Sequence, residues 1–389
     1  MQGIAALVEA VNVSKSVNNP AQLASTQMLA AGCRLVFDTW SRSDADLCTS
    51  SYETLLHLDP SKLDPHQRIA YAHVALLRGN YAETLDLCER SISEASISRV
   101  GHVVNFLVNF GALSARSITF LYRGELGKAL QLTQAGRASP DENLALYWQA
   151  SFREAWLRTQ VFDFEGAKRI CQETGKVGGE HPIFYGQTID QMATGYIALH
   201  AGKYLQAIEH FRNVYEPAVG TKFFLHWWWR LMARLESSNA WLLLGDLASA
   251  HTGANGFLES ALSTADPHLQ ALAWDLKSRV AMADSDLHDA RESIQEALTI
   301  IEKFEIPVAA WQACSTAWQL HQHLKEHKRA DANRERAESY ILKIVNSFEP
   351  DEPLRSSFLN AARVSRILRK KTVDQAVRLP KLRHSASAK

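Results

Sequence analysis

A short pattern that recurs about every forty residues constrains the fold of this chain more than any other feature. Each copy has a turn residue, then an aromatic residue or leucine two positions later, and then usually alanine three positions after that. The turn residue ends one helix, and the small residue lets the backbones of two helices approach closely. Six copies are clear: RGNYAETLDLCERSI (78–92), RGELGKALQLTQAG (123–136), FDFEGAKRICQET (162–174), AGKYLQAIEHF (201–211), LGDLASAHTGA (244–254) and DSDLHDARESIQEAL (284–298).

The small residues give the period of the repeat. Aligned on that position, the copies lie 38 to 45 residues apart, at Ala45, Thr84, Ala129, Ala167, Ala207, Ala250, Ala290 and Ala332. A second small residue stands seven positions before the turn, at Ala72, Ser117, Ala155, Gly195, Ser238 and Ser278. This is the place of the small packing residue in the first helix of a tetratricopeptide (TPR) unit.

A period near forty with two helices per unit is typical of an α-helical solenoid. The chain has only 19 glycines and 11 prolines among 389 residues, which also fits helices joined by short turns. We therefore predict an all-α, right-handed superhelical solenoid of about seven or eight antiparallel helix pairs over residues 1–360. The first and last copies of the pattern are weaker, as the capping repeats of a solenoid often are.

The order of motifs from about Phe223 to Leu368 is more specific than the repeat alone. An aromatic–Arg run is followed by LLLGDLASA, ADPHLQALAWDLKSRVAMADSDLHDARESIQEAL, FEIPVAAWQ and EPLRSSFL. This order resembles the C-terminal TPR region of large bacterial signalling ATPases of the STAND type, which include predicted ATPases fused to adenylate cyclase or kinase modules and relatives of the maltose-regulon activator. The resemblance implies a sensor and interaction arm. Because the sequence lacks ATPase and effector modules, we expect a stand-alone relative or a detached arm.

No motif makes a convincing catalytic or metal site. TGKVGGE (174–180) and HAGKYL (200–205) lack the glycine spacing and the Ser/Thr of a phosphate-binding loop, so we interpret both as turns between helices. HLKEH (323–327) matches an inverted zinc-protease pattern, with His323 and His327 expected on one helix face. Nothing specifies a further carboxylate ligand, and we interpret the motif as solvated helix surface. We predict no enzyme activity, no bound metal and no cofactor.

In a TPR array, the first helix of each pair lines the concave surface, where a partner can bind. One inward position falls at His73, Ile118, Trp156, Tyr196, Asn239 and Arg279. Successive members should be neighbours, because each repeat packs on the next. Trp156 and Tyr196 would supply flat apolar area. Asn239 and Arg279 would supply hydrogen-bond donors, so the stripe suits a peptide. The alternatives are a groove that is merely solvated, or one that a long terminal helix fills.

The run FFLHWWWR (223–230) opens one of these inner helices. Consecutive residues of a helix point about 100° apart, so the three tryptophans cannot share one environment. We expect Trp227 in the core, and Trp229 against a neighbouring repeat or half exposed. Trp228 lies on the concave line of its helix, and we predict that it forms an outer wall of the groove as the fifth site residue.

The spacing of the cysteines indicates the cellular compartment, and the distribution of charge sets the C-terminal tail apart. The five cysteines are widely spaced and form no CxxC motif, which favours a reducing, cytoplasmic compartment. The chain start lacks a basic signal-peptide region, and no stretch is long and apolar enough to predict a membrane span. Residues 361–389 hold nine Lys and Arg and one Asp, so we predict a basic, partly disordered tail. Nucleic acid or an acidic lipid surface is the less favoured interpretation, since no aromatic residues are interleaved.

These expectations combine into one predicted function and one alternative. We predict a non-catalytic scaffold that binds a protein or peptide on its concave face, in bacterial signalling or transcriptional regulation. The alternative is a small-molecule sensor arm that binds a sugar or another metabolite. A deep closed pocket would favour the sensor, and an open groove would favour the scaffold. The identity of the partner and the oligomeric state stay open.

Overall fold

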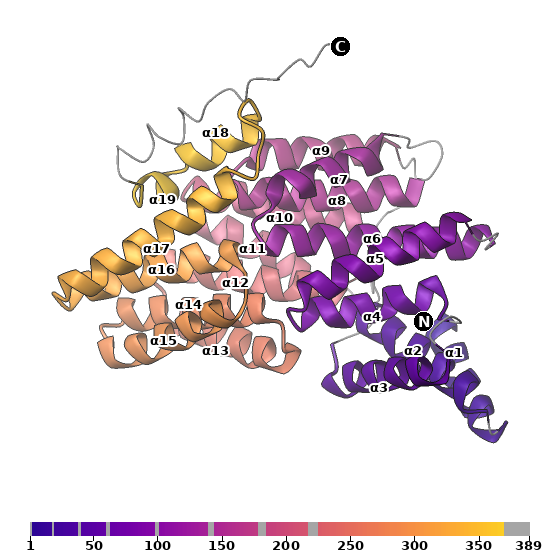
Figure 1. Ribbon diagram of the computed structural model, residues 1–389. Helices are drawn as coiled ribbons and strands as arrows, with labels where there is room; N and C mark the ends of the chain where they lie inside the picture. The colour runs from indigo at the N-terminus through magenta and orange to yellow at the C-terminus, as the bar shows by residue number, and fades with distance from the viewer. Residues whose placement is uncertain are drawn as a thin grey trace, which may run out of the picture.

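The computed structural model describes residues 2–17, 19–37, 40–59, 63–97, 101–138, 144–177, 184–216 and 225–368. Every regular element within these ranges is a helix (Figure 1). The helices are α1 (Gln2–Ser16), α2 (Pro20–Phe37), α3 (Arg42–Leu58), α4 (Pro65–Leu77), α5 (Tyr81–Ile97), α6 (His102–Tyr122), α7 (Leu126–Arg137), α8 (Leu144–Gln160), α9 (Phe164–Val177), α10 (Phe184–His200), α11 (Tyr204–Tyr215), α12 (His226–Leu244), α13 (Leu247–Thr264), α14 (Pro267–Ala283), α15 (Leu287–Lys303), α16 (Pro307–His323), α17 (His327–Val345), α18 (Pro353–Asn360) and α19 (Ala362–Ser365).

Consecutive helices from α2 to α17 pack as eight antiparallel pairs, from α2–α3 to α16–α17. We call the even-numbered helix of each pair helix A and the odd-numbered helix B. Helix α1 precedes the first pair, and the short helices α18 and α19 follow the eighth. Figure 1 shows the pairs wound in chain order. The prediction of an all-α solenoid with seven or eight helix pairs is confirmed.

The turn from helix A to helix B has the same backbone form in the second to eighth pairs. Each of these turns holds one residue with φ between 60° and 86°, namely Gly79, Gly124, Phe162, Gly202, Gly245, Ser285 and Lys325. A left-handed residue ends a helix, and glycine adopts this conformation without a steric penalty. The three other residues adopt it at a cost of about 1–2 kcal/mol each. These turns are the structural origin of the forty-residue period.

The small residue of each repeat lies where helix B crosses helix A. Seven of the predicted residues are at most 1% exposed: Ala45, Thr84, Ala129, Ala167, Ala207, Ala250 and Ala290. In the eighth pair the predicted Ala332 is exposed, and Ala330 is buried in its place. That alignment was wrong by two residues, because Ala330 stands four positions after the cap residue Glu326, as Ala290 does after its own cap. In the seventh pair, Ser278 Oγ donates a hydrogen bond of 2.8 Å to the carbonyl oxygen of Ala290.

The superhelix closes on itself, because a helix pair also contacts the pair five positions later in the chain. The first pair meets the sixth through two tryptophan side chains. Trp227 Nε1 donates to the carbonyl oxygen of Leu35 at 2.8 Å, and Trp40 Nε1 donates to that of Ser263 at 2.7 Å. The rings of Trp40 and Trp227 lie 5.7 Å apart. These hydrogen bonds join residues 192 and 223 positions apart, so the chain must wind back to its start.

The next two pairs repeat this contact. Gly79, in the turn of the second pair, lies so close to Phe304 of the seventh pair that a Cβ would come within 2.6 Å of the ring. The backbone N–H of Gly127, in the third pair, donates to Ser347 Oγ at 3.2 Å, just beyond α17 of the eighth pair. Because the same offset holds in three places, about five pairs complete one superhelical turn.

Helix α18 takes the place of a ninth pair. Its Phe358 is 1% exposed and stacks on Phe162, in the turn of the fourth pair, with ring centroids 6.1 Å apart. The chain stays packed beyond α18, since Val364 and Ile367 are also buried. Residues 369–389 lie outside the described residues. The basic tail and the domain boundary at residue 360 therefore stay predictions.

One helical stretch, Val104–Tyr122 in α6, has the length and the mean hydropathy (1.2) of a membrane span within the described part of the chain. The fold buries 61% of it. Leu121 and Tyr122 at its end are 3% and 0% exposed and belong to the core. We therefore assign this helix to the core of the solenoid.

Candidate functional site

The five predicted site residues lie on helix A of the fourth to seventh pairs, and the structure divides them into two groups. Trp156 (α8) and Trp228 (α12) join Trp229 in a dry group that we call the aromatic cluster. The second group, which we call the polar network, contains Tyr196 (α10), Asn239 (α12) and Arg279 (α14) together with Glu236, Asp275 and Thr316. The two groups have different physical roles.

The aromatic cluster is closed to solvent. The ring centroids of Trp156, Trp228 and Trp229 lie 4.9–5.3 Å apart in edge-to-face geometry, and the three side chains are only 1–2% exposed. The expectation that Trp228 forms an outer wall of the groove is wrong, because Tyr122 on α6 and Trp156 on α8 cover this part of α12. Burying such rings removes about 150–250 Å² each from water. The cluster therefore stabilises the fold.

A chain of buried hydrogen bonds ties Trp228 to the third and seventh pairs. Trp228 Nε1 donates to the hydroxyl of Tyr122 at 2.9 Å, and this hydroxyl donates to Asp266 Oδ2 at 3.1 Å. Asp266 Oδ1 accepts from the backbone N–H groups of His268 (2.9 Å) and Leu269 (3.3 Å), which caps α14. The Tyr122 ring stacks on His268 with centroids 3.9 Å apart. One set of contacts thus joins α6, α12 and α14.

Burial shifts the titration of two groups in this set. It raises the pKa of the Asp266 carboxyl to about 7, although the hydrogen bonds from Leu269, His268 and Tyr122 act in the opposite direction. It lowers the pKa of the His268 imidazole to about 3, so the stacked ring is neutral near pH 7. A neutral ring can be buried against Tyr122 without the cost of a desolvated charge.

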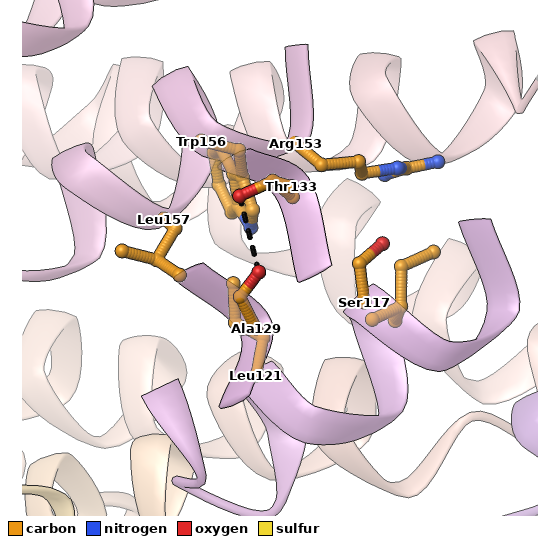
Figure 2. A pocket seen from close by; sticks show the side chains of 8 residues that line it. Ser117, Leu121, Ala129, Thr133, Arg153, Trp156 and Leu157 are labelled. Carbon is orange, nitrogen blue, oxygen red and sulfur yellow. Dashed lines mark hydrogen bonds between the residues drawn. The ribbon is translucent and has the colours of Figure 1, made fainter. Parts of the chain in front are cut away.

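A small enclosed cavity lies beside Trp156 (Figure 2). Its lining residues are Ser117, Ile118, Leu121, Ala129, Thr133, Arg153, Trp156 and Leu157. The cavity volume of 10 Å³ has room for about one water molecule. A metabolite cannot fit there, so this part of the stripe offers no small-molecule site.

The polar network links helix A of successive pairs. Tyr196 donates its hydroxyl hydrogen to Glu236 Oε1 at 3.0 Å, and Asn239 Nδ2 donates to Glu236 Oε2 at 3.0 Å. Arg279 Nη1 donates to Asn239 Oδ1 at 2.7 Å, and its Nε donates to Asp275 Oδ2 at 2.9 Å. The prediction that successive members of the stripe are neighbours is confirmed for Tyr196, Asn239 and Arg279, and also for Trp156, whose ring centroid lies 6.4 Å from that of Tyr196. That they bind a partner stays a prediction.

Two carboxylates hold the network together. Asp275 is 1% exposed, and Thr316 on α16 donates to its Oδ1 at 2.6 Å, which extends the network to the eighth pair. Burial raises the pKa of Glu236, against the hydrogen bonds from Asn239 and Tyr196. Glu236, Asn239 and Arg279 are half-buried and still reach solvent. The network can therefore offer a ligand both donors and acceptors.

The C-terminal segment places a cation at the polar network. The guanidinium carbon of Arg363, on α19, lies 5.6 Å from the ring centroid of Trp311 on α16. The groups of the network that interact electrostatically with Arg363 are Arg279, Asp275, Glu236 and Tyr196. Loss of hydration, and then repulsion by Arg279, lowers the pKa of Arg363. Arg363 remains exposed to solvent, whereas Trp311 beneath it is 3% exposed.

Sequence reasoning missed Glu236, Arg363 and Trp311 as members of this site. Glu236 stands 40 residues after its partner Tyr196. This separation equals the repeat period and could have pointed to the pair. No sequence signal places Arg363, because the path of the chain after the last repeat is not part of the repeat pattern.

The described part of FFLHWWWR, Leu225 to Arg230, marks the start of α12, where the sixth pair meets the first, third and fourth pairs. Trp227 is 7% exposed and buried as expected, but its partners are Leu35 and Trp40 of the first pair. Of the two expectations for Trp229, packing against another repeat and half exposure, the first is confirmed, because Trp229 packs on Trp156 of the fourth pair. Phe223 and Phe224 lie outside the described residues.

The HLKEH motif spans a turn. Helix α16 ends at His323 and α17 begins at His327, so the two histidines lie on different helices, contrary to the expectation of one shared face. His321 Nδ1 lies 2.7 Å from Glu326 Oε2, an ion pair if the ring is protonated. Among the residues that the structure describes, no three His, Cys, Asp or Glu side chains gather to hold a metal. HAGKYL also spans a turn, as interpreted, between α10 and α11.

The fold defines a TPR-like α-solenoid protein, and comparison with known proteins adds no closer relationship. No family model and no curated protein matches this sequence. Among solved structures, the APC/C hetero-tetramer Cut9–Hcn1 is 12% identical with a TM-score of 0.37, over 95% of this chain and 94% of that chain. A monomeric IFIT1 mutant with m7Gppp-AAAA is 11% identical with a TM-score of 0.36, over 94% of this chain and 75% of that chain. These likenesses assign no ligand or partner to this protein.

Proposed function

We propose that this protein is a non-catalytic scaffold that binds a protein or peptide through the polar network on the concave side of its A helices. The network itself carries the proposal. Its side chains come from successive helices and are held by mutual hydrogen bonds, and three of them, Glu236, Asn239 and Arg279, keep contact with solvent. Such pre-ordered donors and acceptors match the N–H and C=O groups of a bound peptide at little entropic cost.

The proposed contacting residues are Tyr196, Asn239 and Arg279, with Glu236 added. Trp156 and Trp228 have a supporting role in this proposal, because they are 2% and 1% exposed and hold the A helices in place. The 10 Å³ cavity beside Trp156 gives no support to the alternative of a metabolite sensor.

We further propose a role in bacterial signalling or transcriptional regulation, in the cytoplasm. The motif order between residues 223 and 368 supports the first part, through its resemblance to the interaction arms of signalling ATPases. The five free cysteines support the second part. Burial raises the pKa of four of these thiols to about 12, which suits small core residues better than reactive ones: Cys48, Cys88, Cys171 and Cys314.

Affinity capture from cells of the native host tests the proposal. The wild-type chain, the Asn239→Ala variant and the Arg279→Ala variant are compared as baits, with circular dichroism to confirm that each is folded. Leu243→Ala is the matched control, because Leu243 lies on the same helix as Asn239 and is 56% exposed. We expect both network variants to lose at least tenfold of a specific protein that the wild type and the control retain. Retention of every specific protein by both folded network variants would contradict the proposed site.

A further inference from the structure

The C-terminal segment places the guanidinium of Arg363 over Trp311 and beside the polar network. We propose that the surface around Arg363 is a binding site for an arginine-bearing peptide, and that the Arg363 side chain occupies this site until a partner's arginine displaces it. The inference rests on the proposed function and deepens it, because it names the chemistry of the partner.

Trp311 provides the first part of such a site. A guanidinium within about 6 Å of a tryptophan ring centroid gains cation–π energy, and Arg363 lies at 5.6 Å. A guanidinium is flat and weakly hydrated, so it stacks on a ring better than the compact ammonium of lysine does. Phe358 packs edge-to-face against Trp311 with ring centroids 6.2 Å apart and restricts the motion of its ring. The platform is therefore ordered before a ligand arrives.

Charge provides the second part. Glu236 and Asp275 interact favourably with Arg363, while Arg279 repels it. With Arg363 withdrawn, the two carboxylates outnumber the single remaining cation of the network, and the surface has an unbalanced negative charge. Tyr196 adds a phenol oxygen next to Glu236. A second guanidinium can replace the first without any change in the charge of the cluster.

The way in which Arg363 is held makes its release easy. Residues other than Arg363 anchor the segment, because Phe358, Val364 and Ile367 are at most 1% exposed. Arg334 Nε also donates to the carbonyl oxygen of Ile367 at 2.9 Å. Arg363 is exposed, so its side chain can leave the network while these anchors stay in place. Its release costs local contacts rather than the unfolding of α18 and α19.

The test uses the full chain and the probe N-acetyl-arginine methylamide, with N-acetyl-lysine methylamide as the control probe. Indole N–H resonances are followed by NMR during titration, and the Trp311 signal is assigned with Trp311→Phe. We expect the Arg363→Ala protein to bind the arginine probe at least tenfold more tightly than the wild type, and at least fivefold more tightly than it binds the lysine probe. Arg366→Ala is the matched variant, since Arg366 is also exposed and lies three residues on. It should behave like the wild type.

Equal affinity of the wild type and Arg363→Ala for the arginine probe would overturn the inference. An equal increase in affinity for this probe in Arg363→Ala and Arg366→Ala would overturn it as well. Should Arg363→Ala perturb the fold, Arg363→Met keeps the length of the stem without the charge and is tested in the same way. If the arginine probe binds as expected but no captured protein depends on Asn239 or Arg279, the inference stands and the proposed function fails. If instead a captured protein depends on Asn239 and Arg279 but the arginine probe does not bind as expected, the proposed scaffold function stands and the inference of an arginine ligand fails.

Discussion

The aromatic cluster and the polar network lie on the same face of the same set of helices, and yet one is core and the other reaches solvent. Trp156 and Trp228 are at most 2% exposed, whereas Asn239 and Arg279 are half-buried. The repeat pattern gives all four residues the same kind of position. The difference arises because α6 and α8, three and two pairs earlier in the chain, cover the start of α12 but leave its middle partly open.

This comparison separates two meanings of an inward-facing position. Within one repeat, inward means toward the axis of the superhelix, and that can be read from the sequence. Whether the axis is filled depends on contacts between pairs that face each other across it, such as the chain from Trp228 through Tyr122 to Asp266. A residue on the stripe thus contributes to stability where such pairs meet and is a binding candidate elsewhere.

The largest expected effect is at the centre of the aromatic cluster. We expect Trp228→Ala to lower the free energy of unfolding by about 3–5 kcal/mol, because it leaves a large cavity in a closed core. Urea unfolding followed by circular dichroism measures the change. Leu243→Ala, on the same helix but 56% exposed, should change it by less than about 0.5 kcal/mol. Similar small losses for both variants would show that the cluster is not a closed core.

The contact between the third and eighth pairs should be nearly as sensitive. In Gly127→Ala, the new Cβ would come within 1.9 Å of the carbonyl oxygen of Ser347, so the two turns must move apart. We expect a loss of about 1–3 kcal/mol in the same unfolding experiment, as for other overpacked sites. Gly256→Ala is the control, because its Cβ meets nothing within 4 Å, and it should stabilise α13 by up to about 1 kcal/mol. Equal effects of the two variants would contradict the close approach of the turns.

The buried carboxyl of Asp266 should give the aromatic side a pH dependence. Its folded pKa of about 7 lies above the value of about 3.9 for an unfolded chain, so the folded protein binds more protons between these pH values. The stabilising contribution is full below about pH 4 and is lost as the pH rises to about 7. Asp266→Asn keeps a cap oxygen without the titration. We expect the wild-type-minus-variant difference in unfolding free energy to fall across this window, by at most about 1.4 kcal/mol per pH unit. If the wild-type-minus-variant difference in unfolding free energy stays constant or rises across this window, the pKa of Asp266 is not raised in the folded protein.

The smallest effect is expected in the polar network. Tyr196→Phe removes one hydrogen bond to Glu236, which keeps its bond from Asn239, so the loss of stability should be about 0.5–1.5 kcal/mol. Tyr204→Phe is the control, because the hydroxyl of Tyr204 makes no hydrogen bond in the part of the chain that the structure describes, and it should be neutral. A loss for Tyr196→Phe as large as that for Trp228→Ala would remove the distinction between the two groups.

The sequence was sufficient to predict the repeat, the helix pairs and the adjacency of stripe residues, because these depend on local features. Left-handed turns at residues such as Gly79 and Gly245 and small crossing residues such as Ala250 recur at a fixed spacing, and each repeat packs on the next. The hydrogen bond between Arg279 and Asn239, 40 residues apart, follows directly from that spacing.

The closure of the superhelix could not be predicted in this way. Its pitch is the sum of small rotations between pairs, and no single residue fixes it. The burial of Trp228 and the contact between Gly127 and Ser347 depend on that sum. The position of Arg363 depends instead on how α18 docks on Phe162, after the periodic pattern has ended.

A double-mutant cycle between Tyr122 and Trp228 tests the central claim, that contacts between A helices across the superhelix make one half of the stripe core. The free energy of unfolding is measured for Tyr122→Phe, Trp228→Phe and the double variant. Because Trp228 Nε1 donates to the Tyr122 hydroxyl at 2.9 Å across three helix pairs, we expect a coupling energy of about 0.5–3 kcal/mol. Additive effects of the two substitutions, with no coupling, would contradict the contact between the third and sixth pairs and with it the claim that such contacts make Trp228 core.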